Sequence, residues 1–517
     1  MDLKPPGPDN VPVPAKLQKR FYEALVMLFV LGQNRGDRVD EEGFDAEPDP
    51  SDLGGEKLRR SFLRNLAYLC DFEIGGDRTT AFALQQTPQR IVYWMASNKG
   101  KPREEDPTKL FAAGILETLK HLEPSQASEI EKELFEKAVA FSSKRISYYA
   151  KALGKEIQVV LESLSENESA GGERPGQHFL QKNIIFLDWL KSLKYATNTP
   201  STICRLCYDS RRSLHYEVVR KRARLGEPCA QRYEKIRHFI GRLNHTQKAI
   251  KVMIEARLEL SYLFSAFEVK RAKSSHSSLP PLLERDPTLM EIAGRLAGDD
   301  GAIELLRRNL GELDRLHQLS KKLSKECQST TWQPRVHAEL ILLDLFWTQH
   351  FEFVGNDKYI GCSKPACYCC YHYITQHPGG FVPPPCHNNL WLKWKAPEIY
   401  DHKETQHIKN REKILQKMAE KIRVDVLAQI IECRGPRSRR PDSLTEISSH
   451  RQLDFDFLSD DPEDGSSESM SETDFSVKSG VEDVVGNMEF SHHAAEEDSE
   501  TEDDEAGGVQ LLSALTA

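Results

Sequence analysis

Two short motifs limit the folds open to this chain more than any other feature of its 517 residues. The first is His337-Ala338-Glu339 at the start of an apolar run, and the second is the pair Cys367 and Cys370, which begins 28 residues after the glutamate. Cysteines three apart on a helix lie on the same side, and the positive end of a helix stabilises thiolates. We therefore predict that one imidazole and two sulfurs converge from two helix starts.

This set of side chains is typical of a catalytic zinc site. Three protein ligands, His337, Cys367 and Cys370, leave the fourth tetrahedral position of Zn²⁺ for water. Zinc lowers the pKa of such a water molecule towards neutrality, and Glu339 is placed to act as the general acid/base. This combination suits attack on C4 of cytosine or C6 of adenine.

The order and spacing of these residues, with Pro365 shortly before Cys367, resemble the zinc signature of the cytidine-deaminase-like superfamily. Residues 359–365 resemble more narrowly the fungal predicted nucleic-acid/nucleotide deaminases, and residues 62–71 also resemble a segment of those proteins. The closest match covers residues 333–397. The resemblance implies a small three-layer α/β domain in which helices pack on a mixed sheet.

The chain departs from the superfamily pattern in three ways. Ala366 separates the proline from the first cysteine, where the superfamily usually has them adjacent. Cys362 and Cys369 are additional thiols, so the spacing alone does not fix a unique ligand set. The first two strands of the fold should precede His337, but the pattern there is mostly helical.

Composition and periodicity divide the chain into a largely α-helical N-terminal region, a small zinc domain and an acidic tail. We predict a mostly disordered linker with one short helix at 1–57, helical regions at 58–164 and 179–273 joined by a linker at 165–178, a deaminase-like zinc domain with flanking helices at 285–433 (core 333–397), and a disordered tail at 441–517. Residues 78–97 are ambiguous by periodicity. The tail has too few apolar residues to offset its chain entropy.

Charge is distributed unevenly. Residues 441–517 contain 22 Asp and Glu against two basic residues, a net charge of −20, and since the whole chain is at −9 the remainder carries +11. The basic charge of residues 1–440 is compatible with a nucleotide or nucleic-acid substrate. The acidic tail either competes with that substrate for the basic surface or only confers solubility.

Other residues near the motifs are weaker candidates. Trp332, Ser363, Lys364 and Pro365 are predicted to contact substrate. A second pair, Cys204 and Cys207, is more typical of core cysteines than of a second zinc site, because no matching pair completes it.

Two alternatives to an enzyme remain open at this stage: a catalytically inactive deaminase-like zinc scaffold, and a structural zinc module whose four ligands leave no open position. The start of the chain lacks the pattern of a secretory signal, and no apolar run is long enough to cross a bilayer. We therefore predict an intracellular protein, cytoplasmic or nuclear, that does not bind membranes and that uses its helical region as a scaffold or to recruit a protein partner. The sequence does not indicate its oligomeric state.

Overall fold

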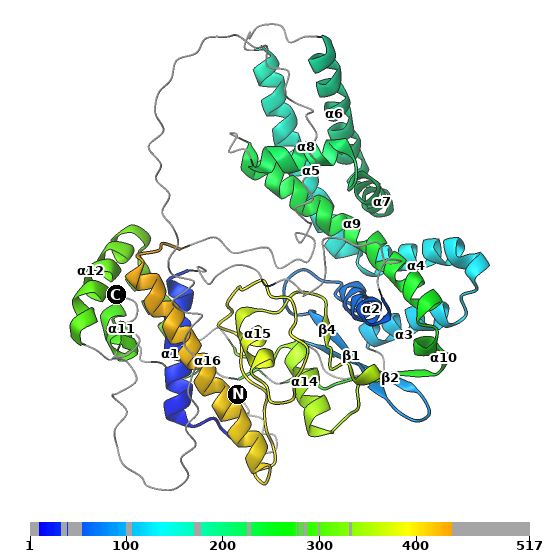
Figure 1. Cartoon of the computed structure of the whole chain (residues 1–517). Coiled ribbons are helices and arrows are strands. Elements are labelled where there is room, and N and C mark those ends of the chain that lie inside the picture. Colours follow the sequence, from blue (N-terminus) through cyan, green and yellow to red (C-terminus); the bar gives the residue numbers. More distant parts are fainter. Residues whose placement is uncertain are drawn as a thin grey trace, which may run out of the picture.

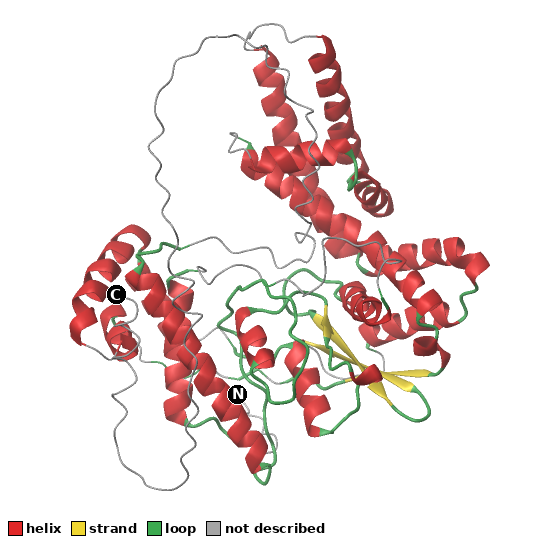
Figure 2. Cartoon of the chain, in the orientation of Figure 1, coloured by secondary structure: helices red, strands yellow, loops and turns green. Residues whose placement is uncertain are grey.

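A computed structural model describes residues 10–32, 39, 54–99, 106–169, 177–224, 229–275, 277–278, 281, 283, 287–297, 300–329 and 333–436. Its centre is a four-stranded mixed sheet in the order β3-β2-β1-β4 (Figures 1 and 2). The strands are β1 Thr80–Gln86, β2 Ile91–Ser97, β3 Phe267–Arg271 and β4 Gly361–Cys362. β1 and β2 form an antiparallel hairpin, β2 pairs in parallel with β3, and β1 pairs antiparallel with β4.

Both faces of the β1–β2 hairpin are covered, because side chains alternate between two cores. Phe82 and Leu84 contribute to a core shared with α2 (Gly55–Cys70), whereas Ala81 and Ala83 contribute to the core that contains α14 (Ala338–Thr348). A strand buried on both faces has a nearly continuous apolar sequence, so its period of two is hidden. This explains why residues 78–97 are ambiguous in the sequence.

The sheet therefore lies between two layers of helices, α2 on one face and α14 on the other. Beyond α14 lie α15 (Tyr368–Thr375), α16 (Thr405–Ile431) and α1 (Ala15–Val30). The prediction of a mostly helical chain with a small mixed sheet is confirmed. The two expected early strands exist, but they lie about 240 residues before His337 in the sequence.

Helix α1 is part of the central core. It begins after Pro14, and every side chain from Phe21 to Leu28 is buried. A helix that is apolar all round is buried all round, and α1 packs along α16. The prediction for 1–57 included one short helix, and α1 is a helix in that range, although it belongs to the core; most of the rest of the range lies outside the described residues.

A helical insertion separates β2 from β3. Its elements are α3 Pro107–Lys120, a 3₁₀ turn Pro124–Gln126, α4 Ala127–Phe141, α5 Ser143–Ser169, α6 Gln177–Ala196, α7 Pro200–Ser210, α8 Leu214–Arg224, α9 Ala230–Glu259 and α10 Tyr262–Ser265. The long helix α9 is central, and α2, α4, α5, α7 and α8 pack against it (Figure 1). The parallel β2–β3 pair requires a crossover connection, and this insertion provides it.

The two ends of the insertion are joined. Asp106 caps α3 by accepting hydrogen bonds from the backbone N–H groups of Thr108 and Lys109, and its carboxylate forms an ion pair with Arg271 at the end of β3. The ranges 58–164 and 179–273 were predicted to be helical. That prediction is wrong at β1, β2 and β3, which belong to the sheet that lies between α2 and α14.

The remaining helices are α11 Leu289–Ala297, α12 Asp300–His317 and α13 Leu319–Gln328, and a 3₁₀ turn spans Val354–Asn356. Within the part of the chain that the structure describes, each helix is too short or too polar to span a lipid bilayer. The predicted linker at 165–178 is helical as far as Ser169 and again from Gln177. The predicted tail at 441–517 lies outside the described residues.

Candidate metal centre and acid/base site

His337 directly precedes the first residue of α14. It is the N-cap of this helix, with extended backbone angles (φ −78°, ψ 157°), and its side chain makes no capping hydrogen bond. The carboxamide oxygen of Asn98, just after β2, instead accepts a hydrogen bond from the backbone N–H of Ala338 at 2.7 Å. The imidazole is therefore left to face the second motif.

Cys367 holds the equivalent position before α15. It is the N-cap of that helix, and its Sγ accepts a hydrogen bond from the backbone N–H of Cys370 at 3.5 Å. Cys370 lies one turn into the helix. Both sulfurs are buried at the positive end of α15, where the helix dipole favours a negative charge.

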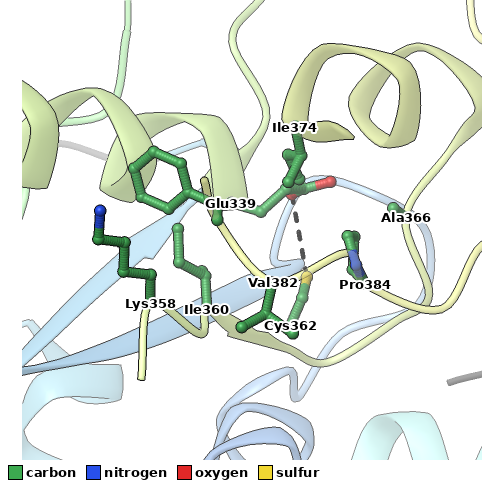
Figure 3. A pocket seen from close by; sticks show the side chains of 9 residues that line it. Glu339, Lys358, Ile360, Cys362, Ala366, Ile374, Val382 and Pro384 are labelled. Atoms are coloured by element: carbon green, nitrogen blue, oxygen red, sulfur yellow. Dashed lines mark hydrogen bonds between the residues drawn. The ribbon is translucent and has the colours of Figure 1, made fainter. Parts of the chain in front are cut away.

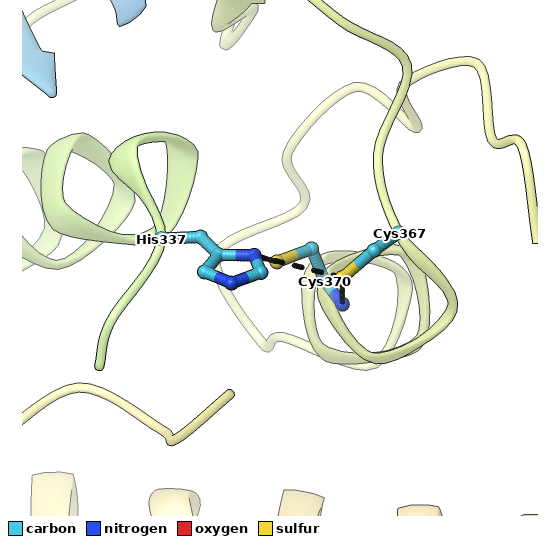
Figure 4. A group of neighbouring side chains, drawn as sticks. All are labelled: His337, Cys367 and Cys370. Atoms are coloured by element: carbon cyan, nitrogen blue, oxygen red, sulfur yellow. Dashed lines mark hydrogen bonds between the residues drawn. The ribbon is translucent and has the colours of Figure 1, made fainter. Parts of the chain in front are cut away.

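The three side chains converge (Figure 4). Nδ1 of His337 lies 3.6 Å from Sγ of Cys367 and 3.3 Å from Sγ of Cys370, and the potential ligand atoms all lie within 4.8 Å of one another. Tetrahedral zinc with Zn–S near 2.3 Å and Zn–N near 2.0 Å requires N–S separations of roughly 3.6 Å. The predicted convergence is confirmed, and the donor set fits a metal ion such as zinc.

The three side chains of the cluster shift one another's pKa values. Burial raises the pKa of the Cys367 thiol, but hydrogen bonds with Cys370 and the nearby imidazole of His337 outweigh burial and hold that pKa well below its usual range. Burial and the Cys367 sulfur raise the pKa of Cys370. Burial alone would lower the pKa of His337, yet the Cys367 thiolate raises it overall.

Glu339 lies beside this cluster in the first turn of α14. It is only 6% exposed, and burial raises the pKa of its carboxyl group, with the nearby imidazole of His337 opposing that effect. Its Oε2 lies 3.9 Å from Sγ of Cys362 on β4 (Figure 3). A buried carboxyl group with a raised pKa next to a metal site has the properties of a general acid/base.

Glu339 borders a small hollow. Phe381, Val382 and Pro384, from the loop after α15, line it together with Ile360 of the segment before β4. Figure 3 labels three of these four residues. The volume of the hollow is about 10 Å³, which is about enough for one water molecule, whereas a dry cavity that holds benzene measures roughly 150 Å³. In this conformation the site has room for a water molecule but not for a base.

The loop that closes this hollow is anchored by His377. Nδ1 of His377 accepts a hydrogen bond from the backbone N–H of Gly379 at 3.1 Å. The imidazole packs edge-to-face against Trp347 and Phe381, with ring centroids 5.0 and 5.2 Å apart. Burial lowers the pKa of His377 to about 4, so the imidazole is neutral and Nδ1 is an acceptor.

Three of the four residues predicted to contact substrate lie in the described part of the chain. Ser363 donates a hydrogen bond to Oδ2 of the buried Asp71 at 3.0 Å, and the ammonium group of Lys364 donates one to the carbonyl oxygen of Gly75 at 2.6 Å. Both side chains thus hold the chain between β4 and α15 to the segment between α2 and β1. Pro365 is buried in the same connection, and Trp332 lies outside the described residues.

Sequence reasoning did not identify two residues that support the centre. Asn98, which caps α14, has no signal in the sequence, because it is distant in the chain and its role depends on the sheet. The indole N–H of Trp394 donates a hydrogen bond to Sγ of Cys370 at 3.2 Å. Trp394 is fully buried.

The other cysteines do not join the centre. Cys204 and Cys207 are buried in the helical insertion, where burial raises the pKa of both thiols. Cys369 is also buried. Among the described residues, the only group of three or more side chains arranged to hold a metal ion is His337, Cys367 and Cys370.

Comparison with known proteins supports a deaminase-like domain at this centre. Residues 336–398 match a family model with the description "OTT_1508_deam:-like deaminase", and this stretch contains all three potential ligands and Glu339. Searches of curated proteins and of solved structures gave no significant match.

Proposed function

We propose that this chain is a zinc-dependent hydrolytic deaminase that acts on a cytosine or adenine base in a nucleotide or nucleic acid. The observation that carries the proposal is the convergence of His337, Cys367 and Cys370 beside the buried carboxyl group of Glu339. The match of residues 336–398 to a deaminase family model supports it independently. The net charge of +11 outside the acidic tail favours a phosphate-bearing substrate.

Each residue of the centre has a defined task in this reaction, in which water replaces an exocyclic amine and ammonia leaves. His337, Cys367 and Cys370 hold the ion, and when bound zinc supplies the Lewis acidity that lowers the pKa of a water molecule. Glu339 would take one proton from the attacking water and pass it to the ring nitrogen, and would then carry the proton of the new hydroxyl group to the leaving amine as the carbonyl forms. Asn98 fixes the start of α14, which keeps the imidazole and the carboxylate in register.

Binding of a base requires additional space. The hollow beside Glu339 holds about one water molecule, so Phe381, Val382 and Pro384 must move away from α14 when a base enters. These residues lie in the loop that His377 anchors, and the adjacent Gly380 has φ +62°. We place the movement in this loop because it connects α15 to Trp394 without regular secondary structure.

The small hollow favours one competing function, a zinc-binding domain that is retained for interaction and has no turnover. In that case the centre stabilises the fold, and Glu339 is a helix N-terminal carboxylate favoured by the dipole. The two functions share the metal and differ only in whether ammonia is released.

The decisive experiment compares the full chain with its Glu339→Gln variant. Metal content is measured by elemental analysis, and ammonia release is measured with nucleosides, nucleotides and single-stranded DNA and RNA oligonucleotides. We expect one zinc per chain in both proteins and a 10²- to 10⁴-fold loss of rate in the variant, the usual contribution of a general acid/base. Glu420→Gln, an exposed substitution on α16, is the matched control and should retain full activity.

Three results would count against the proposal. Wild-type protein that contains zinc but releases no ammonia from any of these substrates would favour the interaction domain. Equal rates for wild type and Glu339→Gln would remove the assigned role of the carboxylate. Protein that cannot be loaded with any metal would exclude both functions.

A further inference from the structure

A second cavity lies on the other side of Trp394 from the metal centre. Its volume is about 200 Å³, and it is enclosed by the segment that leads into α1, by α1 itself, by α16 and by the chain that follows Trp394. The side chains that matter for its chemistry are Val13, Phe21, Tyr22, Trp394 and Arg411. None of the functional assignments above uses this space.

Arg411, on α16, is the unusual group in its wall. The residue is only 2% exposed, and one of its terminal nitrogens donates hydrogen bonds to the carbonyl oxygens of Val11 at 2.9 Å and Pro12 at 3.5 Å. Its Nε has no hydrogen-bond partner, and within the described part of the chain no carboxylate lies within 4.0 Å of the guanidinium group. A buried guanidinium group is costly unless a negative charge or further acceptors complete its coordination.

The neighbouring charges do not meet this need. Lys395 and Glu398, which also line the cavity, form an ion pair with each other at 2.6 Å. Asp344 pairs with His407 at 3.2 Å and acts on Arg411 only from a greater distance. Burial lowers the pKa of Arg411, and Tyr373 and the more distant carboxylates only partly offset that effect. Arg411 therefore places in the cavity wall a buried cation that no described carboxylate neutralises at close range.

One part of the wall is apolar and aromatic, while Asn10, Gln18 and Ser278 add polar side chains elsewhere. The rings of Phe21 and Tyr22 pack edge-to-face with centroids 5.2 Å apart, and Phe21 also packs against Trp394 at 5.5 Å. A cavity of about 150 Å³ holds benzene, so 200 Å³ accommodates one ring with a small substituent. A planar guanidinium group matches the geometry of a carboxylate, which it binds through two parallel hydrogen bonds.

We propose that this cavity is a binding site for a small planar carboxylate of about the size of benzoate, with the carboxylate on Arg411 and the ring against Phe21 and Tyr22. The occupant lies one side chain from the metal centre, since Trp394 lines the cavity and also donates a hydrogen bond to Sγ of Cys370. Pro334, three residues before His337, lines the same cavity. The site is separate from the hollow beside Glu339 and does not depend on catalysis.

Isothermal titration of the full chain with benzoate tests this assignment. We expect saturable binding of one benzoate per chain, and binding at least 10-fold weaker for benzamide, which has the same shape without the charge. Arg411→Met should weaken benzoate binding at least 10-fold. Val13→Trp should abolish it by filling the cavity while leaving Arg411 in place, and because Val13 is only partly buried this variant tolerates the larger side chain.

The matched control is Lys417→Met, which removes one positive charge from an exposed position of the same helix and should bind benzoate like wild type. Circular dichroism confirms that each variant is folded before titration. The assignment is wrong if wild type shows no saturable binding, if benzamide binds as tightly as benzoate, or if the folded Val13→Trp variant binds benzoate normally. If Arg411→Met does not fold, the Val13→Trp and benzamide comparisons still decide the question.

Discussion

Acidification should destabilise the loop over the candidate site through one histidine. Burial lowers the pKa of His377 from 6.5 to about 4, and its neutral Nδ1 accepts the hydrogen bond from Gly379. The unfolded chain binds a proton at this residue below pH 6.5, while the folded chain does so only near pH 4. Stability is therefore lost as the pH falls from 6.5 to 4, and this contribution is constant above and below that window.

The size of the effect follows from the shift of the pKa. A difference of roughly 2.5 pKa units corresponds to about 3 kcal/mol in total, of which about 2 kcal/mol is lost by pH 5. His377→Asn retains an acceptor close to the position of Nδ1 but cannot take up a proton. Between pH 7 and pH 5 the free energy of unfolding should thus fall by about 2 kcal/mol less in the variant than in wild type.

Urea denaturation of both proteins at several pH values measures this difference, and hydrogen exchange of residues 377–385 shows whether the loss is local to the loop. His372, whose pKa burial lowers to about 4, and His245 also lose stability on acidification, but they titrate in both proteins and cancel in the comparison. Parallel pH profiles for wild type and variant would refute the reasoning.

Two further substitutions test the metal centre and the sheet. Cys370→Ser should lower metal affinity at least 10-fold and lower the thermal midpoint of zinc-loaded protein, because bound metal stabilises the fold by about 2.7 kcal/mol at 100 times its Kd. Cys369→Ser changes the neighbouring cysteine, which is outside the ligand group, and this variant should retain its metal in elemental analysis. Equal loss of metal in both variants would contradict the ligand assignment. Gly361→Ala would place a Cβ 2.6 Å from Cβ of Leu63 on α2 and should lower the free energy of unfolding by about 1–3 kcal/mol in chemical denaturation. Gly114 has open space around it, so Gly114→Ala should be neutral or stabilising. No effect of Gly361→Ala would mean that β4 does not lie against α2.

The candidate site was predictable because its geometry is local. The ligands sit at helix starts, and Cys367 and Cys370 are close in sequence, so spacing alone indicated that their sulfurs share one side of α15. The apolar run after Glu339 likewise indicated the buried helix α14. The identity of the metal, the substrate and the catalytic activity stay predictions, because the positions of these side chains do not by themselves determine any of the three.

The sheet could not be predicted from the sequence for two physical reasons. Burial on both faces hides the alternation in β1 and β2, whose side chains on the α14 face include the small Ala81, Ala83 and Ala96 as well as Trp94. In addition, β3 follows the long helical insertion after β2, so no local pattern connects the two strands. The substrate contacts expected at Ser363 and Lys364 stay predictions, and in the structure both side chains donate hydrogen bonds to the segment between α2 and β1.

The divided sheet also determines what can fold alone. Residues 333–436 contain α14, α15 and α16 but only the two residues of β4 from the sheet, and the stretch that matches the deaminase family model lies entirely within them. In the full chain, α14 packs on Ala81 and Ala83 of β1, and its first backbone N–H is satisfied by Asn98. Without the β1–β2 hairpin, an isolated fragment exposes the apolar face of α14 and leaves its N-terminus uncapped, which costs about 1 kcal/mol for the cap and far more for the lost burial.

We therefore expect a purified 333–436 fragment with one equivalent of zinc to bind a hydrophobic dye and to lack a cooperative thermal transition, in contrast to the full chain. Dispersed amide resonances and a sharp transition in that fragment would show that the metal centre folds without the hairpin, and the three-layer arrangement would then not be what positions His337.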